Sequence, residues 1–210
     1  LHSFPTRRSS DLTNAMAEVI LGKKKLAEVI VDTEFKNLRI APATPTLANT
    51  EVELAQAEHR FSRLKYAVQA LQTEYDYIII DCPPSLSLLT VNALIVARYV
   101  LLPVQAEFYA LEGLGQLLET MKLVRQKLNP TLDLVGVLAT MVDNRTSLSG
   151  QVLAEIQKHF PGKVFQNTIP RNVRLAEAPS HGLPIGVYDR FSKGARAYKA
   201  VAKEVTERVS

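Results

Sequence analysis

The sequence contains a single cysteine, Cys82, among its 210 residues. One cysteine cannot form an internal disulfide, so a disulfide framework is excluded and a reducing cytoplasm fits better. No apolar run reaches the length of a membrane span, and the mean hydropathy is +0.01. The four histidines are scattered without the spacing of metal ligands. We therefore expect neither a transmembrane segment nor a zinc site.

The remaining composition is that of one globular domain. Hydrophobic residues make up 47% of the chain, which is enough for a sizeable core. The net charge of +4 and the pI near 9.2 are mildly basic. This balance permits a polyanionic partner without requiring one.

Residues 1–12 do not match the pattern of the rest of the chain. They contain two arginines but no apolar core, so they are not a secretory signal. They resemble a peptide translated from sequencing-adapter DNA. We expect residues 1–12 to be a non-native leader, the domain to occupy residues 13–210, and the natural start to lie further upstream.

The most informative segment is an apolar run that ends at an acid. Three isoleucines at 78–80 follow Tyr77 and lead into Asp81. A short apolar run bounded by turn residues predicts a strand buried on both faces of a parallel sheet, which Pro83 and Pro84 would end. Asp81 would then lie at the carboxyl edge, where open α/β sheets bind ligands and where P-loop NTPases keep an acid that helps to hold magnesium. The alternative is a turn aspartate that only ends a strand.

Strands and helices are expected to alternate along the chain. This alternation predicts an α/β fold with a doubly wound, mostly parallel sheet and helices on both faces. Besides 77–81, we expect strands at 38–41, 99–104, 132–142, 164–169 and 185–188. Helices are expected at 14–21, at 24–29, after Thr50 as the capping residue, and at 61–71, 88–97, 111–128, 152–160 and 198–209.

A loop of the form Gly-x-x-x-x-Gly-Lys-Ser/Thr is absent from the sequence. Gly22-Lys23 lacks the upstream glycine and the hydroxyl residue, and Gly162-Lys163 is followed by Val164. Without this loop no backbone N–H groups are placed to hold phosphates. We expect the first strand and its phosphate loop to precede this chain, and the chain as it stands to bind ATP weakly or not at all.

Three runs, 77–86, 103–114 and 169–180, occur in an order that resembles the ParA/Soj partition ATPases. Residues 42–48 and 51–54 are similar to the middle region of that family. The resemblance covers Thr13 to the C-terminus and places the family's deviant Walker A loop upstream. It implies a domain that binds ATP and Mg²⁺, forms a homodimer when ATP-bound, and binds double-stranded DNA without sequence preference. It also implies ATP hydrolysis stimulated by a ParB-type partner, in a cytoplasmic, nucleoid-associated protein.

The resemblance also assigns roles to particular residues. Asp81 matches the Walker B acid, with a catalytic role and a water-mediated contact to Mg²⁺, and the Pro83-Pro84 loop matches the γ-phosphate switch. Two segments match the positions beside the adenine base, and for them an ordinary turn and a simple strand stop remain alternatives. Their residues are Met141, Asp143 and Asn144 in the first, and Pro170, Arg171 and Asn172 in the second.

Arg145 and Arg174 match family positions implicated in DNA binding. Between residues 160 and 199 only two acids, Glu177 and Asp189, accompany a group of further cations. Such an excess suits contacts to phosphates, although a solvated basic face is the alternative. The further cations are Lys163, Arg171, Arg190, Lys193, Arg196 and Lys199.

Other residues could contribute to a site, and two other functions are rivals. Glu107, Tyr109 and Glu112 are candidates either for a site near the nucleotide and the dimer interface or for helix capping. Cys82 could act as a nucleophile, but the sequence suggests no base partner, so it is expected to be a small buried residue. A MinD-like, membrane-surface ATPase is a rival, but the helix at 195–209 has Tyr, Val and Ala on its apolar face, and Glu204 and Glu207 interrupt its basic face, so no membrane contact is expected. A non-catalytic DNA-binding or interaction module is the other rival.

Overall fold

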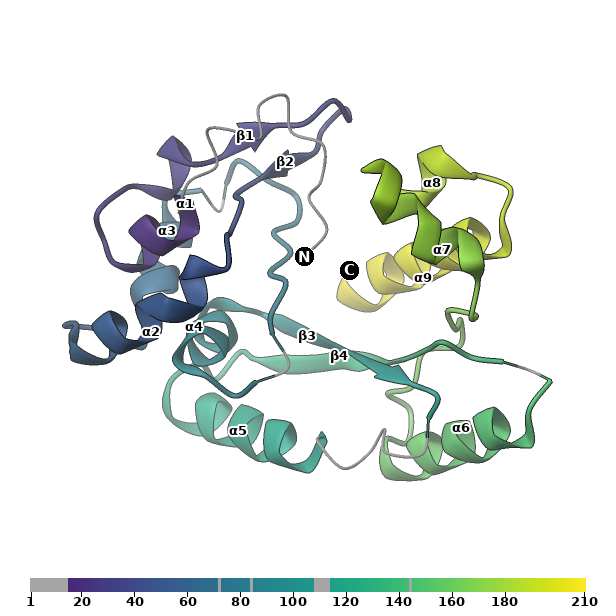
Figure 1. Cartoon of the computed structure of the whole chain (residues 1–210). Helices are drawn as coiled ribbons and strands as arrows, with labels where there is room; N and C mark the ends of the chain where they lie inside the picture. The colour runs from purple at the N-terminus through teal and green to yellow at the C-terminus, as the bar shows by residue number, and fades with distance from the viewer. Residues whose placement is uncertain (1–14, 72, 84, 108–113, 144) are drawn as a thin grey trace. The chain divides into compact units, whose positions relative to one another are not determined.

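The computed structural model describes residues 15–71, 73–83, 85–107, 114–143 and 145–210, which form two compact units (Figure 1). The first, here called the sheet unit, contains Tyr99–Glu119 and Asp133–Ser210. The second, here called the helical unit, contains 15–98 and Thr120–Leu132.

Two parallel strands, both predicted, form the centre of the sheet unit. β3 (Tyr99–Gln105) pairs with β4 (Asp133–Thr140), and the register shifts between Val100 and Leu101. Because Leu101 pairs with Gly136, β4 has one extra residue, as in a β-bulge. A Cβ added at Gly136 would lie 2.5 Å from the Lys163 carbonyl oxygen, so this close approach requires glycine.

Helices cover both faces of this strand pair, as the predicted α/β fold requires (Figure 1). On one face, Leu102 and Val137 pack with Ile156 of α6 (Ser147–His159) and with the start of α5 (Leu114–Lys127). On the other, Val135 packs with Val201 of α9 (Lys193–Val209).

The predicted strand at 164–169 is wrong: this segment forms no strand, although one isolated bridge joins Val164 to Val137 of β4 and a second joins Pro170 to Val142 just beyond β4. The Glu204 carboxylate accepts hydrogen bonds from the backbone N–H groups of Gln166 at 2.8 Å and Asn167 at 3.0 Å. These two N–H groups therefore bond a side chain of α9 and are not available to pair with a neighbouring strand.

The predicted strand at 185–188 is also wrong. These residues form the short helix α8 (Ile185–Tyr188), which follows α7 (Val173–Glu177) and the 3₁₀ turn η3 (Ala178–His181). The N–H groups of Val187 and Tyr188 both bond the Pro184 carbonyl at 2.9 Å. Periodicity cannot distinguish a strand from a helix in so short an apolar run, and local hydrogen bonding decides here.

The helical unit is built around one apolar cluster that includes Leu54, Leu64 and Val68. Its buried Asn92 accepts a bond from the Leu64 N–H and donates to the Arg60 and Leu88 carbonyls, so its polar side chain is satisfied. Its elements are α1 (Ala15–Ile20), η2 (Leu26–Glu28), β1 (Val31–Asp32), β2 (Arg39–Ile40), α2 (Thr46–Gln56), α3 (Arg63–Gln69) and α4 (Leu88–Val96).

Two details of the helical unit differ from expectation. β1 pairs antiparallel with the predicted β2, although no strand was expected at its position. α2 begins four residues before Thr50, whose hydroxyl donates to the Leu47 carbonyl at 2.6 Å. Thr50 therefore lies inside the helix and does not cap it.

The predicted buried strand at 77–81 is wrong as well. Residues 77–83 form no strand, and Ile79 is 92% exposed. Only Ile80 packs against the core of the helical unit. A strand buried on both faces needs a partner strand and covering helices, and no segment within the described ranges pairs with these residues.

Candidate functional site

The segments 141–143 and 170–172 lie side by side just beyond the carboxyl end of β4. The Val142 N–H bonds the Ile169 carbonyl at 3.1 Å, and the Arg171 N–H bonds the Val142 carbonyl at 3.0 Å. Met141 adopts a left-handed backbone conformation with φ of 55°. For a non-glycine residue this costs of order 1–3 kcal/mol, and such strain is typical of ligand sites. The structure thus brings together the two segments that were predicted to lie beside a base.

Asp143 organises the turn that precedes α6. Its carboxylate accepts from Arg145 Nε at 2.9 Å and Nη2 at 2.8 Å, and from the Arg145 N–H at 3.1 Å. These hydrogen bonds from Arg145, side chain first, lower the pKa of Asp143 to about 2. The Asp143 carbonyl also accepts from the Thr146 hydroxyl, and Thr146 caps α6. The turn role is therefore visible, and the role beside a nucleotide stays a prediction.

A second acid meets this edge from β3. Glu107, two residues beyond β3, binds Arg171 Nη2 through Oε1 at 3.0 Å. The charge of Arg171 also lowers the pKa of Asp143. At the carboxyl ends of β3 and β4, the guanidinium of Arg171 therefore interacts with two carboxylates, those of Glu107 and Asp143. Sequence reasoning did not find this Glu107–Arg171 pair, because its members are 64 residues apart.

Asn172 has a local structural role at the same edge. Its Oδ1 accepts from the Arg174 N–H at 2.9 Å, which caps α7. Pro170 makes the bridge to Val142. Both residues hold the turn in a fixed conformation, which a binding surface for a flat ligand requires.

Asp81 belongs to the helical unit. Its side chain is exposed and forms no ion pair within the described part of the chain. Magnesium is usually held by one or two carboxylates together with waters and substrate phosphates, so an accessible, unpaired carboxylate fits that ion. No group of three or more potential ligands gathers in the residues that the structure describes. That Asp81 shares a cavity with the 170–172 turn stays a prediction.

Several predicted positions lie outside the described residues. They are Pro84, Tyr109, Glu112 and Asn144. Pro83, the other proline of the expected switch, is exposed.

Cys82 is exposed, so its expected burial is wrong. Surrounding protein atoms nevertheless desolvate the thiol, and this, together with the negative charge of Asp81, raises the pKa of Cys82. Both effects disfavour the thiolate, which is the nucleophilic form. The geometry therefore gives no support to Cys82 as a nucleophile.

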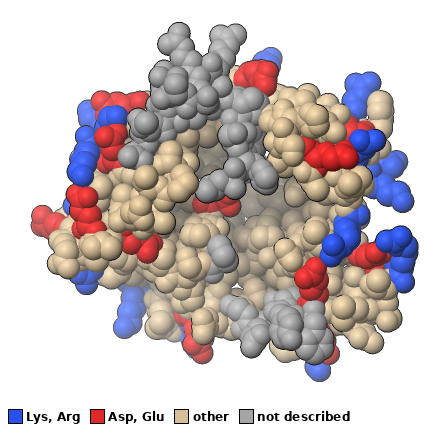
Figure 2. Space-filling model, in the orientation of Figure 1, with Lys and Arg blue, Asp and Glu red and all other residues tan. Residues whose placement is uncertain are grey.

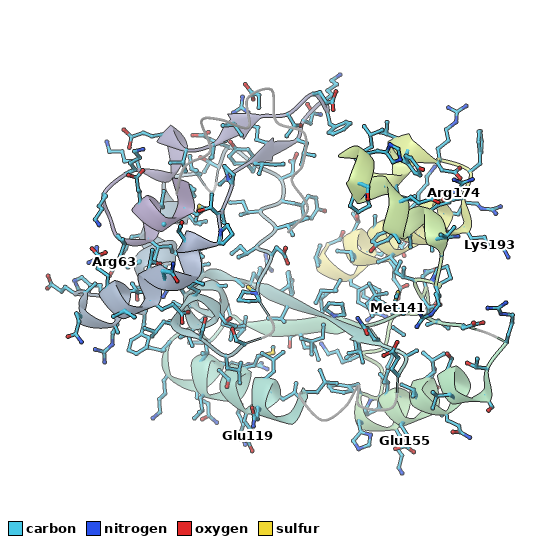
Figure 3. The ribbon with its side chains drawn as sticks, in the orientation of Figure 1. Arg63, Glu119, Met141, Glu155, Arg174 and Lys193 are labelled. Carbon is cyan, nitrogen blue, oxygen red and sulfur yellow. The ribbon has the colours of Figure 1, made fainter. Side chains whose placement is uncertain are left out.

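The predicted DNA-contacting arginines are both paired with acids. Arg145 is 88% exposed and pairs with Asp143. Arg174 Nη1 lies 2.9 Å from Glu177 Oε2, and its Nε lies 3.6 Å from Asp189 Oδ2 (Figure 3). Lys163 pairs with Asp133, an acid from β4 that a local count of charges had missed.

A second group of cations is unpaired. Arg190, Lys193, Arg196 and Lys199 are exposed and form no ion pair among the described residues. Lys and Arg side chains gather over the part of Figure 2 that corresponds to α7–α9 in Figure 1, with carboxylates between them. Arg190 lies over the Phe191 ring at 4.6 Å, which is a cation–π distance.

α9 packs most of its predicted apolar side on its own sheet, although Tyr198 of that side is 47% exposed. Val201 is buried, and Ala197, Val205 and Val209 pack against the same cluster. None of the described helices has the length and apolar character to cross a membrane.

Comparisons with known proteins place these observations in a family. A family model described as an AAA domain matches residues 4–134. The chain is 50% identical over 196 residues to the sporulation initiation inhibitor protein Soj of Bacillus subtilis, covering 93% of this chain and 78% of that protein. It is 47% identical over 201 residues to the chromosome partitioning protein ParA of Myxococcus xanthus, covering 96% of this chain and 71% of that protein.

The fold comparison agrees. A cobyrinic acid a,c-diamide synthase from Mycobacterium smegmatis, solved with ADP and magnesium, matches with a TM-score of 0.78 at 35% identity, covering 93% of this chain and 72% of that chain. A putative plasmid partition protein from Borrelia burgdorferi, bound to AMPPNP, matches in fold with a TM-score of 0.78 at 24% identity, covering 95% and 77%.

Proposed function

Because the chain belongs to the ParA/Soj family of partition ATPases, we propose that residues 13–210 form part of an ATP- and Mg²⁺-dependent motor that separates chromosomes or plasmids. The observation that carries this proposal is the juxtaposition of 141–143 with 170–172 at the carboxyl edge of a parallel strand pair. Such an edge is where open α/β sheets bind nucleotides.

The proposal assigns a separate role to the residues of each unit. Met141, Asp143, Pro170, Arg171 and Asn172 lie beside the base. Asp81 holds Mg²⁺ through water, and the ion, when bound, neutralises charge on the phosphates. Because the sequence has no Gly-rich phosphate loop, we expect the chain as it stands to bind ATP weakly or not at all and to have little hydrolytic activity.

The basic surface of the sheet unit provides the second part of the proposal. Arg145 and Arg174 contact DNA phosphates without reading bases, so binding weakens steeply with salt. The ATP-bound form is a homodimer on nucleoid DNA in the cytoplasm, and a ParB-type partner stimulates hydrolysis and release. The apolar side of α9 is used for packing within its own unit, so a membrane-surface role is not proposed.

Photolabelling tests the base site even when affinity is low. The chain is irradiated with 8-azido-ATP and Mg²⁺, digested, and analysed by mass spectrometry. We expect label in peptides that contain 141–143 or 170–172, and its loss in excess ATP. Label that excess ATP removes from other peptides only would contradict the assignment.

Retention on plasmid DNA at low salt tests the basic surface. Arg145→Glu and Arg174→Glu should each weaken retention, whereas Lys158→Glu on α6 introduces the same change in charge outside the proposed contacts and serves as the control. Lys158 is a suitable control because it is also exposed and paired with an acid, Glu155. Unchanged retention of both arginine variants would count against DNA contact at these positions.

A further inference from the structure

Arg174 is held by two acids that come from different elements. Glu177 lies one turn further along α7, and Asp189 follows α8. Glu177 is itself held in place, because its Oε2 also accepts a hydrogen bond from the Tyr188 hydroxyl at 3.1 Å. The Tyr188 ring stacks on His181 with 4.9 Å between ring centroids. The acid that faces Arg174 is thus fixed by its own contacts.

Asp189 is fixed in a similar way. Its Oδ1 accepts from the Phe191 N–H at 3.2 Å, and its carbonyl accepts from the Ser192 hydroxyl at 2.8 Å. Its other carboxylate oxygen faces Arg174. Both carboxylates are therefore already held by other contacts, and they lose little conformational freedom when they pair with Arg174.

Arg174 nevertheless belongs to the same surface as the unpaired cations. A Cβ added at Gly194 would lie 2.6 Å from Leu175 Cγ, so α7 packs closely on the first turn of α9. Arg174 directly precedes Leu175, and Lys193 directly precedes Gly194. Figure 3 shows Arg174 and Lys193 on adjacent helices. This surface thus combines one arginine that is covered by acids with several cations that are not.

We propose that Glu177 and Asp189 act as internal competitors of DNA phosphate at Arg174 and so set the affinity of this surface. The proposal rests on the DNA binding proposed above. The unpaired cations of α9 make the first contacts, and Arg174 joins only when a phosphate replaces its carboxylates. Exposed ion pairs contribute little stability, so closely spaced phosphates of a duplex can displace them, whereas a single dilute anion cannot.

The test compares Glu177→Gln with the unaltered chain by fluorescence anisotropy on a labelled duplex at several salt concentrations. Freeing Arg174 should tighten binding by about 1.5- to 5-fold, the fold-change that corresponds to an exposed pair. The slope of log K against log salt should stay about the same, because Arg174 contacts a phosphate in both complexes and only the cost of freeing it differs. Tyr188→Phe, which releases Glu177 without changing the charge, should tighten binding by a smaller factor.

The matched control is Glu155→Gln. Glu155 is an exposed acid of α6 that pairs with Lys158 at 3.8 Å, so the variant changes the net charge equally at another place on the sheet unit (Figure 3). Equal tightening by both glutamine variants would show that net charge alone acts, and would overturn the proposal.

The proposal would also be overturned if Glu177→Gln and Tyr188→Phe left the affinity for DNA unchanged while Arg174→Glu weakened it. DNA binding itself would then stand. If Arg174→Glu and Lys193→Glu also had no effect, the proposed DNA-binding function would fail.

Discussion

β3 and the segment 77–83 differ in structure although both begin as apolar runs after an aromatic residue. β3 pairs along its whole length with β4 and is covered by helices on both faces. The 77–83 segment pairs with none of the described residues, and Ile79 faces solvent. The difference shows that a buried strand depends on its neighbours as much as on its own residues. The same substitution should therefore have different effects in the two places.

Truncating one apolar side chain in each segment tests this contrast most strongly. Leu102 of β3 is 5% exposed, and Leu102→Ala should lower the free energy of unfolding by about 2–5 kcal/mol through lost burial and a cavity. Ile79→Ala should change it by less than about 0.5 kcal/mol. Urea denaturation followed by circular dichroism measures both. Similar losses would show that 77–83 is buried in solution.

The close approach at the β4 bulge gives the next largest effect. Gly136→Ala forces a Cβ against the Lys163 backbone and should cost about 1–3 kcal/mol. Gly115→Ala in α5 is the control, because its Cβ meets no atom within 4 Å. It should be neutral or stabilise by up to about 1 kcal/mol. Opposite signs in thermal or urea unfolding are expected, and a loss of equal size in both would contradict the packing described for β4.

Acid should weaken the attachment of α9 to the sheet unit. Burial by itself would raise the pKa of Glu204, but hydrogen bonds from Asn167, Gln166 and Arg208 outweigh it and the pKa lies below its ordinary value. Because the pKa of Glu204 is lower in the folded state than in the unfolded state, its ionised carboxylate stabilises the fold at any pH above the unfolded-state pKa, near 4.3. This stabilisation is lost as the pH falls through the folded-state pKa. Glu204→Gln should cost about 1–3 kcal/mol at neutral pH and flatten this acid dependence. An unchanged acid profile would refute the role of Glu204.

The smallest effect is local. The pKa of the Asp143 carboxyl should be about 2 in a carboxyl ¹³C NMR titration, because Arg145 donates to it. Arg145→Ala should raise it towards 3.8, the ordinary value. No movement of the pKa would show that the Asp143–Arg145 pair does not persist in solution.

Much of the fold could be predicted because amphipathic spacing identifies helices that cover a sheet. α5, α6 and α9 followed from such spacing, whereas β3 and β4 followed from short apolar runs. The errors occurred where a partner distant in sequence decides. Glu204 takes the donors of 166 and 167, and no pattern within 164–169 reveals this.

The candidate site could also be predicted only in part. The segments 141–143 and 170–172 could be predicted to be neighbours because a family resemblance relates them. The acids that cover the arginines could not all be predicted. Glu177 lies near Arg174 in sequence, whereas Glu107 is 64 residues from Arg171 and only the fold brings them together.

The central proposal assigns the acid after the triple-isoleucine run and the turns beyond β4 to one nucleotide. Cys82, the only cysteine, adjoins Asp81 and provides a native attachment point. With Met141→Cys as the second point, a bifunctional thiol reagent no longer than an ATP molecule should link the two cysteines in the folded chain. If both thiols react with a monofunctional reagent but no link forms, Asp81 and the base-side turns do not share a site, and the nucleotide-pocket account is wrong.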